Sequence, residues 1–261
     1  MRLRPLSELL AKENLPLGRQ LVLQHVVKEA LSCRIKQIAV VVGPRKLEIG
    51  RCLETFAGQP GIELDLAVQE PPQGLGDAVL TCRSWVGESP FAVLLADTII
   101  ESHSSPLLQR LITAHRKHGA AATIAVEPVP DHHIPHYGIV APLDKADEVF
   151  QLRDVVEKPP LDQAPSNLAI AGRYVFEPVI MEALARTRSG HGGEIQLTDA
   201  IRALARKRLP IYAVRLQPQE RRHDIGNFAT YYRAFFDFAL ADQELGGAFR
   251  RWASERLEES S

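Results

Sequence analysis

Short apolar segments recur along the chain and predict β-strands. They lie at residues 38–42, 62–68, 91–96, 121–126, 137–140, 155–157, 169–176 and 211–216. Residues 38–42 and 91–96 are continuous apolar runs, whereas residues 62–68 alternate apolar and polar side chains. Continuous runs are typical of strands buried on both faces, and alternation is typical of a half-buried strand.

Segments with apolar residues at helical spacing separate these strands. They lie at residues 21–31, 77–85, 107–118, 179–186, 198–207 and 228–240, and the last one begins a helical region that runs towards Arg256. Strands that alternate with helices indicate an α/β fold, with a mostly parallel sheet covered by helices on both faces. We predict one domain over residues 1–240 and a C-terminal helical tail over residues 241–261.

Composition narrows the class of protein. The chain has 261 residues, enough for a sizeable core, and its net charge of −1 argues against nucleic-acid and membrane surfaces, which usually need a basic excess. It has no apolar run of 18 residues and no signal-peptide pattern. The three cysteines lack metal-ligand spacing, which favours reduced, partly buried thiols in a cytoplasmic protein.

Two aspartates follow predicted strands. Asp97 ends the apolar segment at residues 91–96, and Asp224 lies in a polar stretch after residues 211–216. In open α/β sheets, ligands bind beyond the carboxyl ends of the strands, and a carboxylate there can hold a magnesium ion against phosphate oxygens. For each aspartate taken alone, a cap or an ordinary turn is the simpler interpretation.

Other charged residues are candidate ligand contacts. Glu157 and Lys158 end a short strand, where they can meet a sugar hydroxyl and a phosphate, or form an exposed charge pair. Glu194 lies in a glycine-rich turn, as a second hydroxyl acceptor or as a charge favoured at a helix start, with Thr198 or Asp199 helping to begin the helix. Lys12 is either a phosphate contact or a solvent-exposed side chain.

Two further motifs have open interpretations. Gly74 and Gly76 let the backbone approach a ligand and Asp77 can cap the next helix, but many tight turns share this pattern. His132, His133 and His136 form either a metal cluster or a solvated loop. We favour the loop, because no carboxylate or cysteine lies beside them at zinc spacing.

The order of these motifs resembles that of the bacterial UTP–glucose-1-phosphate uridylyltransferases, also called UDP-glucose pyrophosphorylases. The matching stretches are residues 12–17, Gln69 with 74–80, 94–97, 126–129, 137–140, 156–159, 164–175, 193–201 and 224–227. Residues 164–175 and 193–201 are specific to this family, and the other stretches are shared with related sugar nucleotidyltransferases. The resemblance implies a Rossmann-like nucleotide-diphospho-sugar transferase fold.

The resemblance also implies a role for each matched residue. Gln69 and Gly74 correspond to uracil-recognition positions, and Asp97 and Asp224 to a Mg²⁺-binding pair. The implied glucose-binding set is Gly138, Glu157, Gly172 and Glu194. Lys158 corresponds to a lysine on the sugar phosphate and Lys12 to a phosphate-neutralising lysine, which makes Lys12, Asp97 and Lys158 the implied catalytic residues. The implied reaction converts UTP and glucose 1-phosphate into UDP-glucose and pyrophosphate.

The sequence departs from the family pattern at its beginning. Family members start with a buried strand and a Gly-Gly-x-Gly-Thr-Arg loop, whereas this sequence starts at Met1-Arg2. The expected fold therefore lacks its first strand and has an open edge with unpaired backbone. Ser7-Glu8 replace Thr-Lys, and a negative charge ~4 Å from a phosphate costs a few kcal/mol. Ala96 replaces a proline, a change that we expect to be tolerated.

Three explanations fit these departures: a misassigned start, a fragment, or a degenerate paralogue. We favour the first two together, and hence an active enzyme. The alternative is a non-catalytic or regulatory UDP-glucose-binding paralogue that associates with an active homologue. A third interpretation keeps the fold but changes the nucleotide or sugar, for example to dTTP. The resemblance further implies a homo-oligomer, in which residues 231–236 either form a contact or pack on their own core.

Overall fold

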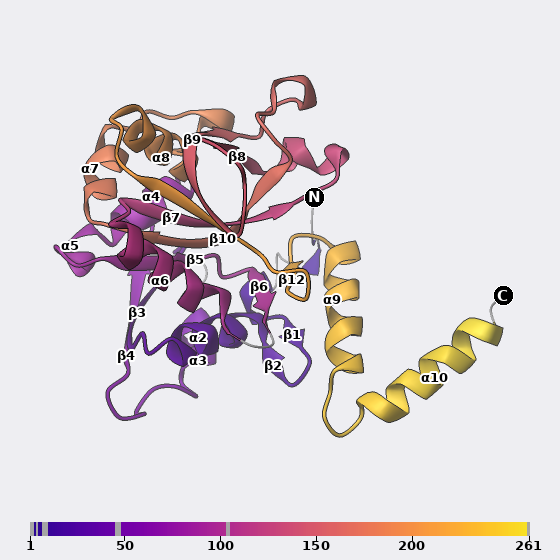
Figure 1. The fold of residues 1–261 in the computed structure, drawn as a ribbon. Helices are drawn as coiled ribbons and strands as arrows, with labels where there is room; N and C mark the ends of the chain where they lie inside the picture. Colours follow the sequence, from indigo (N-terminus) through magenta and orange to yellow (C-terminus); the bar gives the residue numbers. More distant parts are fainter. Residues whose placement is uncertain (1–2, 4, 7–9, 45–47, 103–104, 260–261) are drawn as a thin grey trace.

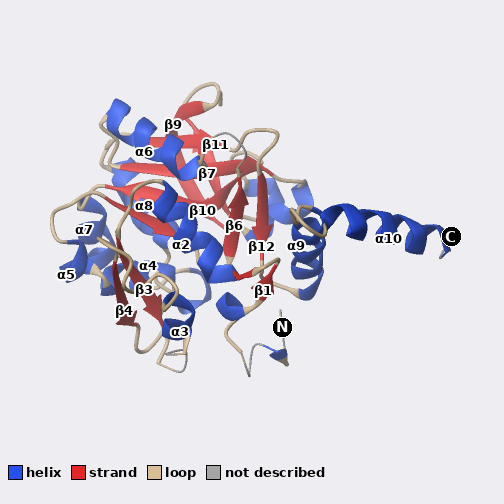
Figure 2. Cartoon of the chain, turned by 90° about the horizontal axis from the view of Figure 1, so that it is seen from below, coloured by secondary structure: helices blue, strands red, loops and turns tan. Residues whose placement is uncertain are grey.

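The computed structural model describes residues 3, 5–6, 10–44, 48–102 and 105–259, and the strands within them form one large sheet and three small ones (Figures 1 and 2). The large sheet has the order β5-β10-β7-β11-β9-β8. Its strands are β5 (Phe91–Leu94), β7 (Ala122–Pro128), β8 (Gly138–Pro142), β9 (Val149–Glu157), β10 (Leu168–Phe176) and β11 (Ile211–Arg215). The small sheets are β1 (Pro16–Leu17) with β2 (Gln20–Leu21), β3 (Gln37–Val42) with β4 (Glu63–Val68), and β6 (Thr98–Glu101) with β12 (Arg221–Asp224).

The predicted α/β architecture is confirmed, but the large sheet is mixed rather than mostly parallel. Strand β10 runs antiparallel to both of its main neighbours, β5 and β7, and β8 and β9 form an antiparallel pair. In the large sheet, β11 with β7 is the parallel pair among the described strands. Apolar runs show that strands are buried, but not in which direction they run, so the pattern could not reveal this reversal.

Helices cover both faces of the large sheet. Alternate residues of β7 point to opposite faces, so that Ile124 and Val126 belong to one core cluster and Ala125 to another. The first cluster includes side chains of α4 (Leu75–Thr81), α7 (Val179–Arg186) and α8 (Leu197–Arg206), and the second those of α6 (Leu107–His118). The amphipathic patterns at residues 107–118 and 179–186 therefore predicted two of these helices with their observed bounds.

A smaller unit packs beside the large sheet. Strands β3 and β4 enclose a core with α2 (Val22–Ser32) and α3 (Ile49–Leu53). Among the described residues, β3 pairs with β4 only and β5 pairs with β10 only, so the two sheets are not joined by a backbone ladder. The contact between them is therefore made by side chains and loops.

Arg173 on β10 makes the main polar connection between the two units. Its side chain is fully buried, and its Nη2 donates to Glu29 on α2 at 2.8 Å and to the carbonyl of Thr98 at 2.7 Å. The preceding residue, Gly172, has φ +73° at an irregularity in the β10–β7 register. A Cβ at Gly172 would lie 3.1 Å from Leu95, so both the backbone turn and the close approach favour glycine here.

The C-terminal helices extend from the body of the molecule. Helix α9 (Phe228–Leu240) lies beside it, and α10 (Gly246–Glu259) projects away in both views (Figures 1 and 2). The helical region after residue 228 is thus two helices, and the predicted helix at residues 77–85 is likewise divided at Cys82 into α4 and α5 (Arg83–Val86). No described helix is long and apolar enough to cross a membrane. Ser7 and Glu8 lie outside the described residues.

We expect Arg173→Met to lower the free energy of unfolding by about 3–5 kcal/mol, because the variant leaves Glu29 without its buried partner. Urea denaturation measures this change. The matched control is Lys145→Met, which breaks an exposed pair with Asp147 and should cost at most about 1 kcal/mol. Equal losses in the two variants would show that the Arg173 pair does not hold the two units together.

Candidate functional site

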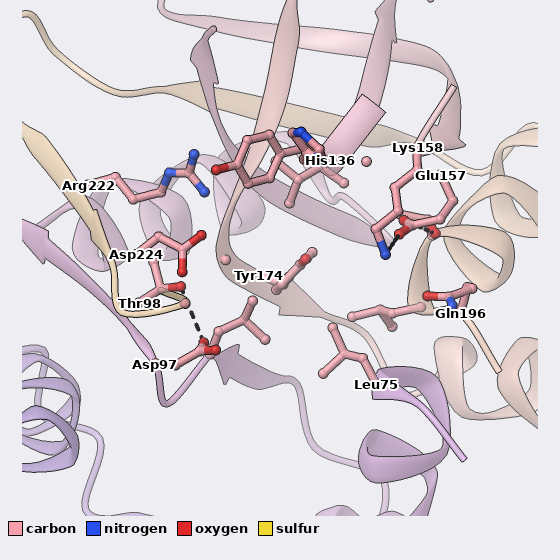
Figure 3. A pocket seen from close by; sticks show the side chains of 18 of the residues that line it. Leu75, Asp97, Thr98, His136, Glu157, Lys158, Tyr174, Gln196, Arg222 and Asp224 are labelled. Atoms are coloured by element: carbon pink, nitrogen blue, oxygen red, sulfur yellow. Dashed lines mark hydrogen bonds and ion pairs between the residues drawn. The ribbon is translucent and has the colours of Figure 1, made fainter. Parts of the chain in front are cut away.

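A cavity of about 430 Å³ opens where the large sheet meets the β6–β12 ribbon (Figure 3). Eight of the ten residues to which the resemblance assigns a role line it: Lys12, Asp97, Gly138, Glu157, Lys158, Gly172, Glu194 and Asp224. Asp97, Asp224 and Arg222 lie on one side, and Glu157, Lys158 and Gln196 lie across from them (Figure 3). Residues spread over most of the chain therefore converge on one site with two chemically different sides.

The two aspartates are placed by the pairing of β6 with β12. Asp224 ends β12 opposite Thr98, and the backbone N–H of Ile225 donates to the Asp97 carbonyl at 2.9 Å. Lys12 forms an ion pair with the Asp97 carboxylate. Burial by itself would lower the pKa of Lys12, but the attraction and hydrogen bond of Asp97, with the nearby charges of Glu13 and Asp224, outweigh it and raise that pKa, so Lys12 stays charged.

The carboxylate oxygens of the aspartate pair are suitable ligands for a hard divalent cation. No group of three or more His, Cys, Asp or Glu side chains able to hold a metal occurs in the part of the chain that the structure describes. Two carboxylates leave most coordination positions to other oxygen ligands, such as phosphate and water. This donor set fits a magnesium ion bound together with a phosphate ligand. It fits zinc less well, because zinc sites have three or four protein ligands, mostly His nitrogen and Cys sulfur.

The opposite side presents Glu157 as a fixed acceptor. Its Oε2 accepts a hydrogen bond from Thr198 Oγ1 at 2.8 Å, and its Oε1 lies 3.0 Å from Lys158 Nζ. Gly138 lies directly across the ladder, where a Cβ would come within 2.8 Å of Thr198 Cγ2. Lys158 has φ +43°, a backbone conformation that is uncommon for residues other than glycine. Its backbone N–H donates to the Tyr137 carbonyl at 3.0 Å.

Glu194 is placed by a contact between two loops. The Gly76 N–H donates to the Ile195 carbonyl at 2.8 Å, and the Ile195 N–H donates to the Gln73 carbonyl at 2.7 Å. Gly74 has φ +103°, and a Cβ there would lie 2.7 Å from the Glu194 Cβ. Glycine at position 74 therefore allows the turn before α4 to approach the backbone of Glu194.

Gln69 and Gly74 are the two residues with a role implied by the resemblance that do not line the cavity. Gln69 Nε2 donates to the Gly74 carbonyl at 3.0 Å and to Asp77 at 2.7 Å, so Gln69 supports the turn at residues 73–77. Asp77 consequently accepts a hydrogen bond from a side chain, and Gly74 is the N-cap of α4, without a side-chain cap bond.

Sequence reasoning missed Arg222 and assigned Thr198 a different role. Arg222 lines the cavity with a side chain that is 9% exposed, and its guanidinium lies 4.4 Å from the ring centre of Tyr137. The polar run at residues 221–224 did not resemble a strand, yet it forms β12. The spacing of Arg222 and Asp224 could have indicated this residue, because two residues that are two positions apart in a strand share one face.

The histidine segment forms a short 3₁₀ helix, η2 (Asp131–His136), rather than an irregular loop. His132, His133 and His136 are exposed, and the rings of His132 and His133 lie 4.3 Å apart. His136 lines the cavity. The three cysteines are buried and unpaired, as predicted, and burial raises the pKa of each thiol.

The sequence and the structure both match known proteins. Residues 1–239 match the nucleotidyl transferase family. The chain is 34% identical to a UTP–glucose-1-phosphate uridylyltransferase of Bacillus subtilis (strain 168), over 94% of this chain and 89% of that protein. It superposes on UTP-bound UGPase from Acinetobacter baumannii with a TM-score of 0.84 at 33% identity, covering 97% of this chain and 94% of that one. A UDP-glucose pyrophosphorylase complexed with UDP-glucose gives a TM-score of 0.82 at 31% identity, covering 92% and 94%.

We expect Gly138→Ala to lower the free energy of unfolding by about 1–3 kcal/mol, because the new methyl group must displace Thr198. Thermal denaturation measures the loss. Gly43→Ala is the control, since a Cβ at Gly43 would meet no atom within 4 Å. If the two variants melt alike, the close packing of Gly138 against Thr198 is not a constraint on the site.

Proposed function

The chain belongs to the UTP–glucose-1-phosphate uridylyltransferase family of nucleotidyl transferases, and on this premise we propose that it makes UDP-glucose. The observation that carries the proposal is the two-sided cavity, with an aspartate pair on one side and Glu157 and Glu194 on the other. A nucleoside diphosphate sugar fits these groups. Its sugar hydroxyls need acceptors such as the glutamates, and its phosphates need cations, which Lys12, Lys158 and a metal ion held by the aspartates would supply.

In the proposed reaction, a phosphate oxygen of glucose 1-phosphate attacks the α-phosphorus of UTP. The bond from the α-phosphorus to the bridging oxygen breaks, and pyrophosphate leaves with the electron pair. No covalent intermediate with the chain is required. The contribution of the protein is then positioning and charge neutralisation, which account for most of the catalysis of phosphoryl transfer.

We assign the phosphates to the cationic groups of the cavity. Lys158 would contact the sugar phosphate, and Lys12 would move from Asp97 to a phosphate oxygen when a cation takes its place. Asp97 and Asp224 would hold Mg²⁺, which when bound neutralises charge on the phosphates. The lining residues support a metal requirement, since they include four carboxylates and three cationic side chains and so add no positive charge of their own.

We assign the glucose to the opposite side. Glu157 and Glu194 would accept hydrogen bonds from its hydroxyls, with Thr198 and Gln196 orienting the two carboxylates at 2.8 and 3.3 Å. Gly138 and Gly172 leave room for the ring, because neither carries a side chain into the cavity. Gln69 and Gly74 would meet the uracil through the turn before α4, outside the cavity lining.

We also propose a cytoplasmic homo-oligomer. Three buried, unpaired thiols are in keeping with a reducing compartment. Helices α9 and α10 and the segment between them leave large apolar side chains exposed, among them Tyr232, Leu245, Trp252 and Leu257. A row of exposed aromatic and aliphatic residues is typical of a protein contact, and a second copy of the chain is the partner that the family resemblance implies. Sedimentation equilibrium would return a single monomer mass if this contact does not form.

Pyrophosphate release from UTP, glucose 1-phosphate and Mg²⁺ tests the function. We expect Asp97→Asn to lower kcat by roughly 100-fold or more, the scale on which one lost electrostatic contact slows a reaction. Asp131→Asn, at an exposed position of η2 outside the cavity lining, is the control and should leave kcat unchanged. UDP-glucose binding by a wild-type chain that releases no pyrophosphate would instead indicate a binding paralogue.

Glu194→Gln should raise the KM for glucose 1-phosphate by roughly 10- to 100-fold, because a sugar hydroxyl loses a charged acceptor. Initial rates at saturating UTP measure this change. Glu88→Gln, at an exposed position, is the matched control. An unchanged KM in Glu194→Gln would place the sugar elsewhere.

A further inference from the structure

Arg222 is a nearly buried cation in the cavity that has no assigned role. It lies on β12, and its side chain is 9% exposed. Its Nε donates to the Glu127 carboxylate near the end of β7, and its guanidinium carbon Cζ lies over the Tyr137 ring, 4.4 Å from the ring centre. A buried guanidinium charge is costly unless its partners compensate for it, so the positions of Glu127 and Tyr137 around Arg222 are constrained.

Tyr137 connects Arg222 to the glutamate side of the cavity. Tyr137 directly precedes β8, and its carbonyl accepts the hydrogen bond from the N–H of Lys158 at 3.0 Å. Lys158 in turn pairs with Glu157 at 3.0 Å. Arg222 therefore contacts the ring of the same residue whose carbonyl holds the backbone of Lys158, next to Glu157.

Asp224 connects Arg222 to the aspartate side. Residues 222 and 224 share one face of β12, whereas Arg221 and His223 point to the other face. His223 pairs with Glu101 at 3.3 Å and Arg221 with Asp237 at 3.7 Å, away from the cavity. Figure 3 shows the guanidinium of Arg222 beside the Asp224 carboxylate, facing the interior.

We propose that Arg222 is a positioning residue that fixes the distance between the aspartate pair and the Tyr137–Lys158 side of the cavity. The inference rests on the proposed function, because the two sides must hold the diphosphate and the sugar of one ligand. In this role Arg222 acts through Tyr137 and Asp224, since Glu127 accepts from its Nε and its guanidinium lies over the Tyr137 ring.

The geometry explains why arginine occupies this position. A lysine would keep the charge but would lose the planar group that stacks on Tyr137 while donating to Glu127. A methionine would keep the apolar stem and lose every polar contact. The series Arg222→Lys and Arg222→Met therefore separates charge from geometry.

Calorimetric titration with UDP-glucose is the first test, with Mg²⁺ and with EDTA. We expect Arg222→Met to weaken binding roughly 10- to 100-fold in both conditions, because both sides of the site lose their spacing, and Arg222→Lys to give a smaller loss of the same kind. Arg221→Met is the matched control, since its side chain is 66% exposed on the opposite face, and its binding should equal that of the wild type. Equal binding by Arg222→Met and Arg221→Met would overturn the inference.

A double-mutant cycle with Tyr137→Leu, titrated in EDTA, tests how Arg222 acts. If Arg222 positions the site through Tyr137, Arg222→Met should weaken binding by less than ~3-fold in the Tyr137→Leu background. A full, additive loss in that background would show direct contact with the ligand and would overturn the positioning role. If Arg222→Met does not fold, Arg222→Lys is carried through the same cycle with the same criterion.

The two proposals fail in different ways. A wild-type chain that does not bind UDP-glucose would overturn the proposed function and this inference with it. A wild-type chain that binds UDP-glucose, together with Arg222 variants that bind equally well, would leave the function standing and remove the inference alone.

Discussion

The buried ion pair between Arg173 and Glu29 is the interaction on which the arrangement of the site depends. No backbone ladder joins the two units among the described residues, so side-chain contacts such as this pair connect them. The same contacts support the turn that carries Asp97, because Arg173 Nη1 also donates to the Leu95 carbonyl at 3.4 Å. Breaking a buried pair of this kind is costly, because the partner that remains is a buried charge without compensation.

The carboxylates on the two sides of the cavity are held by different kinds of partner. The aspartates are held by β-ladder geometry and Lys12, so they can exchange a lysine for another cation. The glutamates are held by neutral donors, Thr198 and Gln196, in addition to Lys158, so they keep free lone pairs for hydroxyl groups. One ligand that is anionic at one end and a polyol at the other satisfies both sides.

Much of this fold could be predicted from the sequence, because buried elements have strong periodicity. Helices α6 and α7 and strand β10 are examples, since their apolar residues face a continuous core. Strands β6 and β12 were not predicted. They form a separate two-stranded sheet, and the sequence of β12, Arg221–Asp224, has no apolar residue that would indicate a strand. Eight of the ten proposed site residues line one cavity, a convergence that motif order implied. Arg222 was missed because its role depends on Glu127 and Tyr137, which only the fold brings to it.

The central claim is that one ligand spans both sides of the cavity, and a crystal structure of the chain with UDP-glucose and Mg²⁺ tests it most directly. We predict that the diphosphate lies beside Asp97 and Asp224 and that the glucose hydroxyls lie within hydrogen-bonding distance of Glu157 and Glu194. Electron density for the sugar at the aspartates, or for the whole ligand outside this cavity, would contradict the account.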